Sequence, residues 1–489
     1  MEDRLSSLPD DLLLSILRDL PLKHAARTSA LSRRWVPQWI RALADSPVLD
    51  FTDRDFAHGQ PADRAAATVG RCLRLHAEHG APLDAFRVAL VSPPGPGYGA
   101  FGRDVIGWIA AAVARGAREV EVDLTPSQEG ADHGSAAFLE LPGDLFRSRS
   151  SLERLALGRL SLRAVPLPAA GLAGLRSLSL SHTDVTDEAL RGVLATCRAL
   201  ESLSLRCCSL LTEVSVASER LRALELLGCR AVRDLRVAAP ALESFAMYGD
   251  VILSAAAVDW YETVSVDFAA APALRDVYLS HMDGCEDGDD YNCMDRVPYT
   301  YVNRDKFPYV DMPNLQELQL LLGCIQEEGD WNPRHPERVY TFFYSTSLPV
   351  LERLFIRLSR NPAKEVEDSD SDEDEDEYLS DRAVSRLLTF GLLTFIKVVN
   401  FRGTWRERRL IRYLLLRAPI LEQLVLVTPE GGLGAPGFEH VEGIQEWVSA
   451  RQKASREART SVYRPSEDDS PNHAHTRIFN EEYCCMHQG

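Results

Sequence analysis

The chain has 489 residues, of which 45% are hydrophobic and 26% charged, and it carries a formal net charge of −18 at pH 7. This composition is that of a folded globular protein with room for two or three domains, and its acidic balance argues against a broad nucleic-acid-binding face. No apolar run approaches the roughly 20 residues that cross a bilayer, so we expect neither nucleic acid nor a membrane as a partner.

Residues Leu8–Pro21, "LPDDLLLSILRDLP", predict the first helix. Pro9 suits a first helical turn, two acids follow it at the positive end of the helix dipole, and Pro21 ends the helix. The apolar side chains cover an arc of roughly 200°, about twice the stripe that a surface helix needs. Residues 22–29 and 30–43 predict two further helices. A unit this small rarely stabilises itself, so either the rest of the chain or a partner protein covers its surplus leucines.

The stretch "LPDDLLLSILRDLPLKHAARTSALSRRW" resembles an F-box, with its opening Leu-Pro, the acids, the Leu-Leu and Ile-Leu pairs and the later Leu-Ser-Arg-Arg-Trp. The resemblance implies docking to the Skp adaptor of a cullin-based ubiquitin ligase. The family's adaptor-facing apolar positions fall here on Leu8, Pro9, Leu12, Leu13, Ile16, Leu17, Leu20, Leu31 and Trp35. Pro37 departs from the pattern, because a proline inside the third helix should kink or end it.

A six-residue phrase with leucines at positions one, four and six recurs along the body of the chain, and its early copies are 21 to 25 residues apart. That period is typical of leucine-rich repeats. We expect the last two apolar positions to face inward on a short strand and the leading leucine to pack where the chain turns into it. The leading leucines are Leu152, Leu175, Leu200, Leu221, Leu242, Leu274, Leu315, Leu351 and Leu421. The sequence therefore predicts an α/β fold, with a three-helix F-box at residues 1–48 and a leucine-rich-repeat solenoid at 49–428.

Longer intervals between the late repeats indicate insertions. One of them, residues 361–380, contains the acidic run Glu365–Glu377, which we expect to be a solvated, disordered loop. Ser369 and Ser371 each have an acid three residues downstream, so the functional alternative is phosphorylation by an acid-directed kinase. Residues 385–428 are similar to the FBD-type ending of plant F-box/leucine-rich-repeat proteins, which implies a last repeat strand at Phe395–Phe401. For residues 429–489 we expect a helix at Val441–Arg459 and a flexible tail.

Two motifs resemble ligand-binding sites, but other features of the sequence argue against each. A G-x-G-x-x-G spacing follows an expected strand, but a proline-rich loop separates the two, which argues against a dinucleotide site. The C-terminal histidines and cysteines lack a regular zinc spacing, so we expect no metal. Neither the common nucleotide-binding motif nor the serine-hydrolase and zinc-protease motifs occur, so we expect no cofactor and a non-catalytic chain. The glycines of the first motif are Gly97, Gly99 and Gly102, and the histidines and cysteines of the second are His473, His475, Cys484, Cys485 and His487.

The ten cysteines are scattered, and the adjacent pairs Cys207/Cys208 and Cys484/Cys485 are poorly placed to join distant segments. We therefore expect a reducing compartment, the cytoplasm or the nucleus. The acidic N-terminus lacks the basic region of a signal peptide.

These observations together predict a substrate-recognition subunit of a Skp–cullin–F-box E3 ubiquitin ligase in a plant. The F-box would dock the Skp adaptor and, through it, cullin, while the repeats would hold an unidentified target protein. Two alternatives remain, a non-catalytic scaffold without ligase activity and a receptor in which a small molecule completes the target site. Polar strand positions are candidates for target contact, namely Ser177, Ser179, Ser202, Ser204, Arg222 and Glu225.

Overall fold

The computed structural model describes most of the chain and divides it into two compact units between Leu211 and Thr212. Each unit is described by itself. None of the described helices is long and apolar enough to cross a membrane. The described residues are 8–20, 22–53, 56, 60–91, 98–124, 138–163, 169–229, 231–248, 253–254, 264–268, 270–282, 310–323, 339, 342–343, 346–358, 389–430, 440–473 and 475. The acidic run with Ser369 and Ser371, and the candidate ligands Cys484, Cys485 and His487, lie outside them.

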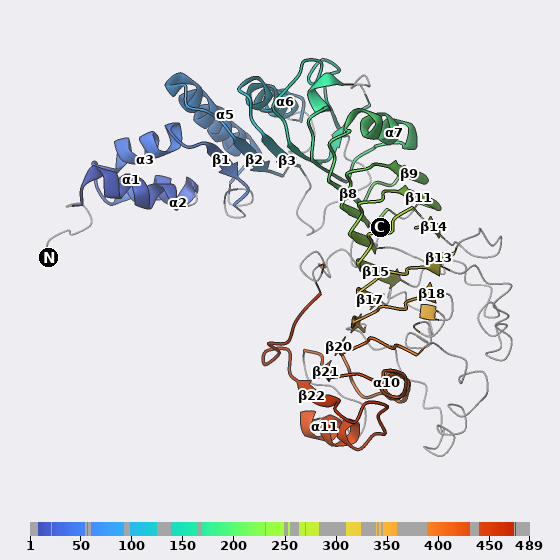
Figure 1. Ribbon diagram of the computed structural model, residues 1–489. Helices are drawn as coiled ribbons and strands as arrows, with labels where there is room; N and C mark the ends of the chain where they lie inside the picture. The colour runs from blue at the N-terminus through green and yellow to red at the C-terminus, as the bar shows by residue number, and fades with distance from the viewer. Residues whose placement is uncertain are drawn as a thin grey trace, which may run out of the picture. The chain divides into compact units, whose positions relative to one another are not determined.

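The first unit begins with helices α1 (Asp10–Arg18), α2 (Leu22–Arg27) and α3 (Trp35–Ala44), with a 3-10 turn η1 (Thr28–Ala30) after α2 (Figure 1). Pro9 is the N-cap residue of α1 and so lies one position before the first helical turn in which it was expected, and that turn carries the two expected acids. The predicted third helix is shorter than expected, since it begins at Trp35 and not at residue 30.

Pro37 explains the late start of α3. It is the third residue of the helix, in the first turn, where backbone N–H groups have no intrahelical acceptor. A proline there removes no hydrogen bond and brings a φ angle that already suits the helix. The expectation that Pro37 would kink or end the third helix is therefore wrong, because the helix begins close enough to the proline to accommodate it.

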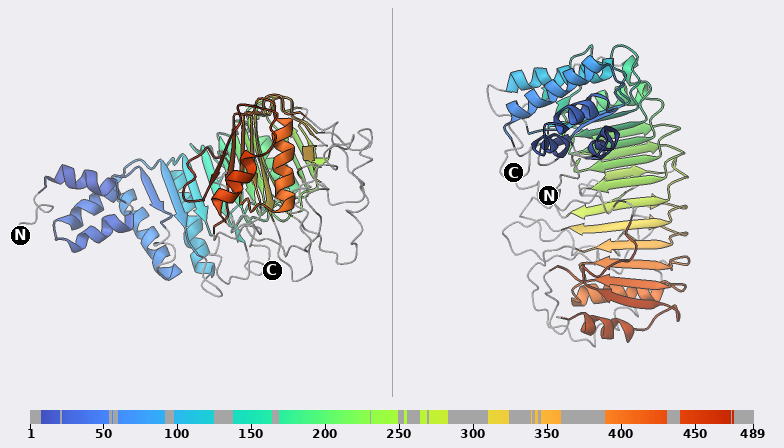
Figure 2. Two further views of the ribbon diagram at one scale, coloured as in Figure 1. Left: turned by 90° about the horizontal axis from the view of Figure 1, so that it is seen from below. Right: turned by 90° about the vertical axis from the view of Figure 1, so that its left-hand side faces the viewer.

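The rest of the first unit is a parallel sheet with helices between its early strands (Figure 2). Its strands pair in the order β1-β2-β3-β5-β7-β8, all parallel. A Cβ on Gly102 would come within 2.7 Å of the end of the Leu139 side chain, one on Gly99 would meet nothing within 4 Å, and Gly97 lies outside the described residues. The elements are β1 (Val48–Phe51), α5 (Ala62–His79), β2 (Ala85–Ala89), α6 (Tyr98–Ala114), β3 (Glu119–Asp123), β4 (Leu139–Glu140), β5 (Arg154–Gly158), β6 (Leu160–Ser161), η3 (Ala170–Leu172), β7 (Ser177–Ser181), α7 (Asp187–Thr196) and β8 (Ser202–Arg206).

The second unit has a parallel sheet in the order β10-β12-β15-β17-β19-β20-β21-β22 and a smaller parallel sheet in the order β13-β14-β11-β9. Its elements are β9 (Glu213–Ala217), β10 (Ala223–Leu227), β11 (Asp234–Ala238), β12 (Ser244–Tyr248), β13 (Leu253–Ser254), β14 (Val264–Asp267), β15 (Asp276–Met282), β16 (Val310–Asp311), β17 (Glu317–Gly323), β18 (Thr346–Ser347), β19 (Arg353–Arg357), β20 (Phe395–Val399), α10 (Trp405–Arg417), β21 (Gln423–Val427), α11 (Val441–Ser449) and β22 (Arg459–Tyr463).

The six-residue repeat phrase forms strands whose leucines are buried, as predicted. All nine leading leucines are buried, at 3% exposure or less. On β7, Leu178 and Leu180 point into the core while the serines between them stay half-buried. Within each unit, the strands of successive repeats pair in parallel, so that neighbouring repeats share an apolar layer that no single repeat could bury.

The C-terminal segment differs from the expectation. The predicted strand near Phe395 is β20, but the helix expected at Val441–Arg459 ends at Ser449, and β22 then joins β21 as a further parallel strand. The chain beyond β22 is described as far as His475 and lies against the second unit's own sheet. The expected helix is therefore present in part as α11, whereas the boundary at residue 428 and the flexible tail are wrong for residues 459–463, which pair as β22 with β21.

Candidate functional site

The three N-terminal helices bury one side of their leucines in a core of their own. Leu13, Leu14 and Leu17 of α1 pack with Trp35 of α3, and Ala25 and Ala42 complete the cluster. Leu13 is fully buried and Trp35 is 2% exposed. This packing uses only part of the wide apolar arc of α1.

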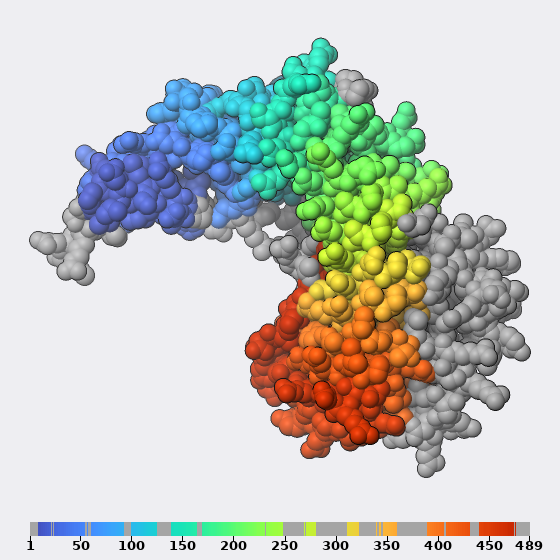
Figure 3. Space-filling model, viewed as in Figure 1, coloured from blue at the N-terminus to red at the C-terminus, as the bar shows by residue number. Residues whose placement is uncertain are grey.

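The remaining apolar side chains of these helices face outward. Five of the eleven exposed large apolar residues in the described chain fall between residues 12 and 36, and we call them the N-terminal apolar surface: Leu12, Ile16, Leu20, Leu31 and Val36. The first three repeat every four residues, which is the spacing of one helix face. In the view of Figure 3 the side chains of these helices, in dark blue, lie open at the molecular surface.

The nine residues predicted to face an adaptor divide into groups in the structure. Leu13, Leu17 and Trp35 belong to the core and offer a partner no surface in this conformation. Leu8 is half-buried against that core. Those open to a partner are Pro9, Leu12, Ile16, Leu20 and Leu31. Sequence reasoning missed Val36, which is 38% exposed and lies beside Trp35 in the first turn of α3.

An ion pair ties the start of α1 to the start of α3. Arg34 Nε donates to the carboxylate of Asp10 over 3.1 Å, and both side chains remain exposed. Thr28 Oγ1 donates to the carbonyl of Ala25 over 2.6 Å and ties η1 to α2. Exposed pairs contribute about 0–1 kcal/mol each, so they fix the orientation of the helices more than they stabilise them.

A second candidate surface is the polar side of the strands in the first unit. Arg87 of β2 donates to Glu119 of β3 over 2.7 Å and lies 3.4 Å from Asp50 of β1. The guanidinium of Arg87 lowers the pKa of the Glu119 carboxyl, and the two carboxylates raise the pKa of Arg87. Among the serine positions predicted to be available, Ser177, Ser179 and Ser202 are half-buried and Ser204 is buried. In the second unit, Arg222 is exposed and Glu225 is half-buried.

The structure brings together two of the five tail residues considered as metal ligands. The rings of His473 and His475 lie 5.4 Å apart, both buried, beside Asp276 of β15. Asp276, Glu317 and His473 offer atoms within 4.8 Å of one another. None of the five described cysteines is joined in a disulfide: Cys72, Cys197, Cys207, Cys208 and Cys229.

Comparison with known proteins finds two domains in the chain. Residues 5–35 match the F-box domain, and residues 105–282 match the leucine-rich repeats described for FBD-associated F-box protein At5g56370. The chain is 30% identical over 242 residues to "F-box protein At5g03100" of Arabidopsis thaliana, covering 49% of this chain and 67% of the relative. It is 31% identical over 208 residues to the Arabidopsis "F-box/FBD/LRR-repeat protein At3g52680", covering 42% and 40%.

The fold and the matches define a protein that joins an F-box to leucine-rich repeats, a class of typically non-catalytic adaptors whose F-box domains typically bind Skp adaptors. The chain belongs to the plant family of F-box proteins with FBD-associated leucine-rich repeats. The alignments span about two thirds of the first relative and about two fifths of the other.

Proposed function

We propose that this protein is the substrate-recognition subunit of a Skp–cullin–F-box ubiquitin ligase. Its N-terminal helices form a three-helix F-box that docks a Skp-type adaptor, and its repeats form a solenoid that holds a target protein. The observation that carries the proposal is the N-terminal apolar surface, which lies within or directly beside the residues that match the F-box domain.

The energetics favour a protein partner for this surface. Exposed large apolar side chains concentrated on a small helical unit mark an interaction site, because water solvates them poorly. A standard interface buries about 800 Å² on each partner, and a few central residues supply most of its energy. Ile16 of α1 lies between Leu12 and Leu20, the residue that follows the helix C-cap, so we assign it the central position.

The chain would act by proximity and without chemistry of its own. A target bound to the repeats and an adaptor bound to the F-box are held on one chain, which raises the effective concentration of the target near an activated conjugating enzyme. The leucine-rich-repeat and F-box family is typically non-catalytic, which supports this assignment of roles. We expect the complex in the cytoplasm or the nucleus, where the ligase machinery would meet its targets.

A pull-down with purified Skp adaptor tests the docking surface. Ile16→Asp should abolish adaptor binding, because it would bury an unpaired carboxylate at the centre of the interface. Pro9→Ala should weaken binding modestly, since it removes a small exposed contact and a pre-set helix start. Val48→Asp is the matched control, because Val48 is 38% exposed and Ile16 39%, but Val48 lies on β1 outside the surface. Full binding by Ile16→Asp, with an unchanged circular dichroism spectrum, would refute this docking surface.

Ligase function needs a separate measurement. The intact complex should bring cullin with it in co-purification and should support ubiquitination of whatever protein the repeats retain. Adaptor binding without cullin would favour a non-catalytic scaffold instead. Proximity labelling with the full chain and with residues 1–48 removed should show target proteins in both samples and ligase components only in the first.

A further inference from the structure

The second unit's main sheet has one apolar side and one side on which polar residues mix with aromatic ones, including the buried pair Phe355 and Phe395. Register places Phe245, Val277, Leu318, Leu354 and Ile396 on one side, and all five are fully buried. The other side, which we call the polar strand face, carries the alternate residues of β12, β15, β17, β19 and β20: Ser244, Ala246, Asp276, Tyr278, Glu317, Gln319, Arg353, Phe355, Phe395 and Lys397.

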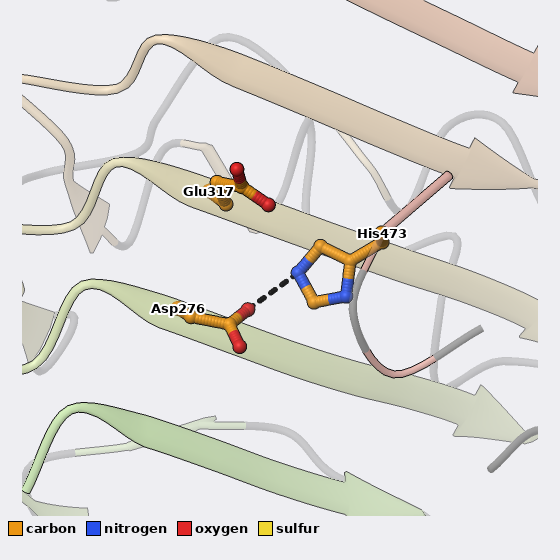
Figure 4. A group of neighbouring side chains, drawn as sticks. All are labelled: Asp276, Glu317 and His473. Atoms are coloured by element: carbon orange, nitrogen blue, oxygen red, sulfur yellow. Dashed lines mark ion pairs between the residues drawn. The ribbon is translucent and has the colours of Figure 1, made fainter. Parts of the chain in front are cut away.

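The chain's own C-terminal segment lies on this face. We call residues 468–475 the C-terminal strap; all of them but residue 474 are described. After β22 the chain runs back past β20 and β19 to β15 (Figure 1), and Figure 4 shows His473 reaching Asp276 from outside the sheet. The ring of His473 also lies 5.4 Å from that of Phe355 on β19.

Lys397 anchors one end of the strap. Its Nζ lies 2.6 Å from Oδ2 of Asp468, and the lysine side chain is 1% exposed. The same ammonium donates to Oδ1 of Asn472 over 2.8 Å and to the carbonyls of Ser470 and Pro471 over 3.4 Å. The hydrogen-bond and ion-pair partners of this buried lysine thus all lie on one short segment. A lysine on a protein surface binds a peptide carboxylate in the same way.

Asp276 anchors the other end. Its Oδ1 lies 2.5 Å from Nε2 of His473 and its Oδ2 lies 3.0 Å from Nε2 of His475, which is also 2.7 Å from Oγ of Ser244. Burial alone would raise the pKa of Asp276, but the hydrogen bonds from the two imidazoles hold it well below its usual range. Each carboxylate oxygen therefore faces an imidazole of the strap, and Oδ2 also accepts a hydrogen bond from Oγ of Ser244 over 3.0 Å.

A metal ion is the less favoured occupant of this cluster. The backbone N–H of His475 donates to Nδ1 of His473 over 3.2 Å, so Nδ1 is an acceptor and a neutral ring carries its proton on Nε2, toward Asp276. Glu317, the third candidate ligand, is paired with Arg353 at 2.5 Å. Oδ1 of Asp276 and Nε2 of His473 lie only 2.5 Å apart, which is closer than two ligands of one metal ion approach each other.

The strap is held by polar contacts at Lys397 and Asp276, and its two histidines add ring contacts to Phe355 and Tyr278. Asp469, Pro471 and Asn472 are exposed, and only the two histidines are buried. Released into water, the strap would leave Lys397 and Asp276 solvated and not stranded in an apolar interior, so its release avoids the penalty of an unpaired buried charge.

We propose that the polar strand face is a binding surface for an extended peptide segment with an acid and, five residues later, a histidine, and that the strap occupies this surface in cis. A target segment of that chemistry competes with the strap, which makes target capture conditional on strap release. The competition with a target rests on the proposed function, whereas the occupancy of the face does not.

A peptide competition experiment on the full chain tests this. The probe is a fluorescent synthetic peptide with the sequence of residues 464–476. The strap-released variant is Asp468→Ala/His473→Ala/His475→Ala, and Asp469→Ala is the matched control, an exposed acid next to the anchor. The released variant should bind the peptide at least about tenfold more tightly than wild type or control, because the tethered strap competes at an effective concentration in the millimolar range.

Further variants decide between competition and a structural role. Adding Lys397→Met and Asp276→Asn to the released variant should remove peptide binding. Hydrogen exchange should rise in residues 464–473 of the released variant and stay unchanged on the apolar strand positions. A rise in hydrogen exchange across all of β12–β20 would overturn the proposal, and so would the absence of peptide binding at millimolar concentration. One equivalent of zinc retained by the wild type and lost with Asp276→Asn would also overturn it. Adaptor binding is measured separately, so failure of the docking surface would leave this result intact.

Discussion

Leu12 and Leu13 are neighbours on α1, but Leu12 is 52% exposed whereas Leu13 is fully buried. Leu13 contributes to the core that holds α1 against α3, whereas Leu12 belongs to the N-terminal apolar surface. Of these two adjacent leucines, Leu13 therefore stabilises the helical unit, and Leu12 leaves an apolar side chain open to a partner.

Alanine substitutions should make this separation measurable. Leu13→Ala should cost about 2–5 kcal/mol of unfolding free energy, because it leaves a cavity in the core. Leu12→Ala should change stability by no more than about 0.5 kcal/mol and should weaken adaptor binding instead. Hydrogen exchange across residues 10–44 gives the stability of the helices, and the adaptor pull-down gives binding. Equal destabilisation by both changes would contradict the assignment of the two faces.

The strands were predictable because their signal is local. The phrase that begins at Leu175 places apolar residues at a period of two, and only a strand buries one side of that pattern. The burial of Leu178 and Leu180 follows from it directly. The helices carried less information, since a helical wheel treats Leu12, Leu13 and Ile16 alike. Which of them face α3 depends on tertiary packing.

The polar cluster at the C-terminus could not be predicted from the sequence. Asp276 and His473 come from opposite ends of the second unit, and the spacing of either residue gives no sign of the other. The two tail histidines were noted in the sequence, but without a regular zinc spacing they indicated no metal, and their spacing gave no sign of a partner on β15. Only the path of the chain after β22 brings the two segments together.

A charge on the apolar side of a strand should disrupt the repeats. Leu203 of β8 is fully buried, so Leu203→Asp would remove about 1.5–3 kcal/mol of apolar burial and add an unpaired carboxylate to the core. Ser202→Asp is the control, because Ser202 is half-buried on the opposite side of the same strand. Thermal melts and protease resistance should fall for Leu203→Asp and change little for the control. A wild-type melt for both would mean that Leu203 is not a core residue.

Deletion of the acidic run tests an expectation that lies outside the described residues. Removing residues 365–377 should leave the melting temperature nearly unchanged, because a run of ten acids among thirteen residues has little apolar surface to bury. The measurement is differential scanning calorimetry of the deletion and wild-type chains at matched ionic strength. A large drop would show that the run contributes to the fold.

Glu407 should make stability depend on pH in an unusual direction. Its carboxylate accepts backbone N–H groups of Arg402 and Gly403 at 2.8 Å and of Thr404 at 3.2 Å in a capping box at the start of α10. Burial raises its pKa to about 7 in spite of these donors. Between its unfolded pKa, about 4.3, and pH 7, the folded state therefore keeps a proton that the unfolded state gives up, and stability falls as pH rises.

Glu407→Gln removes this titration while keeping an oxygen that can accept the same backbone donors. The unfolding free energy of wild type minus that of Glu407→Gln should therefore decrease between pH 5 and 7, by up to about 1.4 kcal/mol per pH unit. Thr404→Ala is the control, because losing the N-cap hydroxyl should cost about 1 kcal/mol at every pH. Urea unfolding at a series of pH values gives both quantities. A difference that grows with pH would instead mean that the backbone donors keep Glu407 ionised in the folded chain.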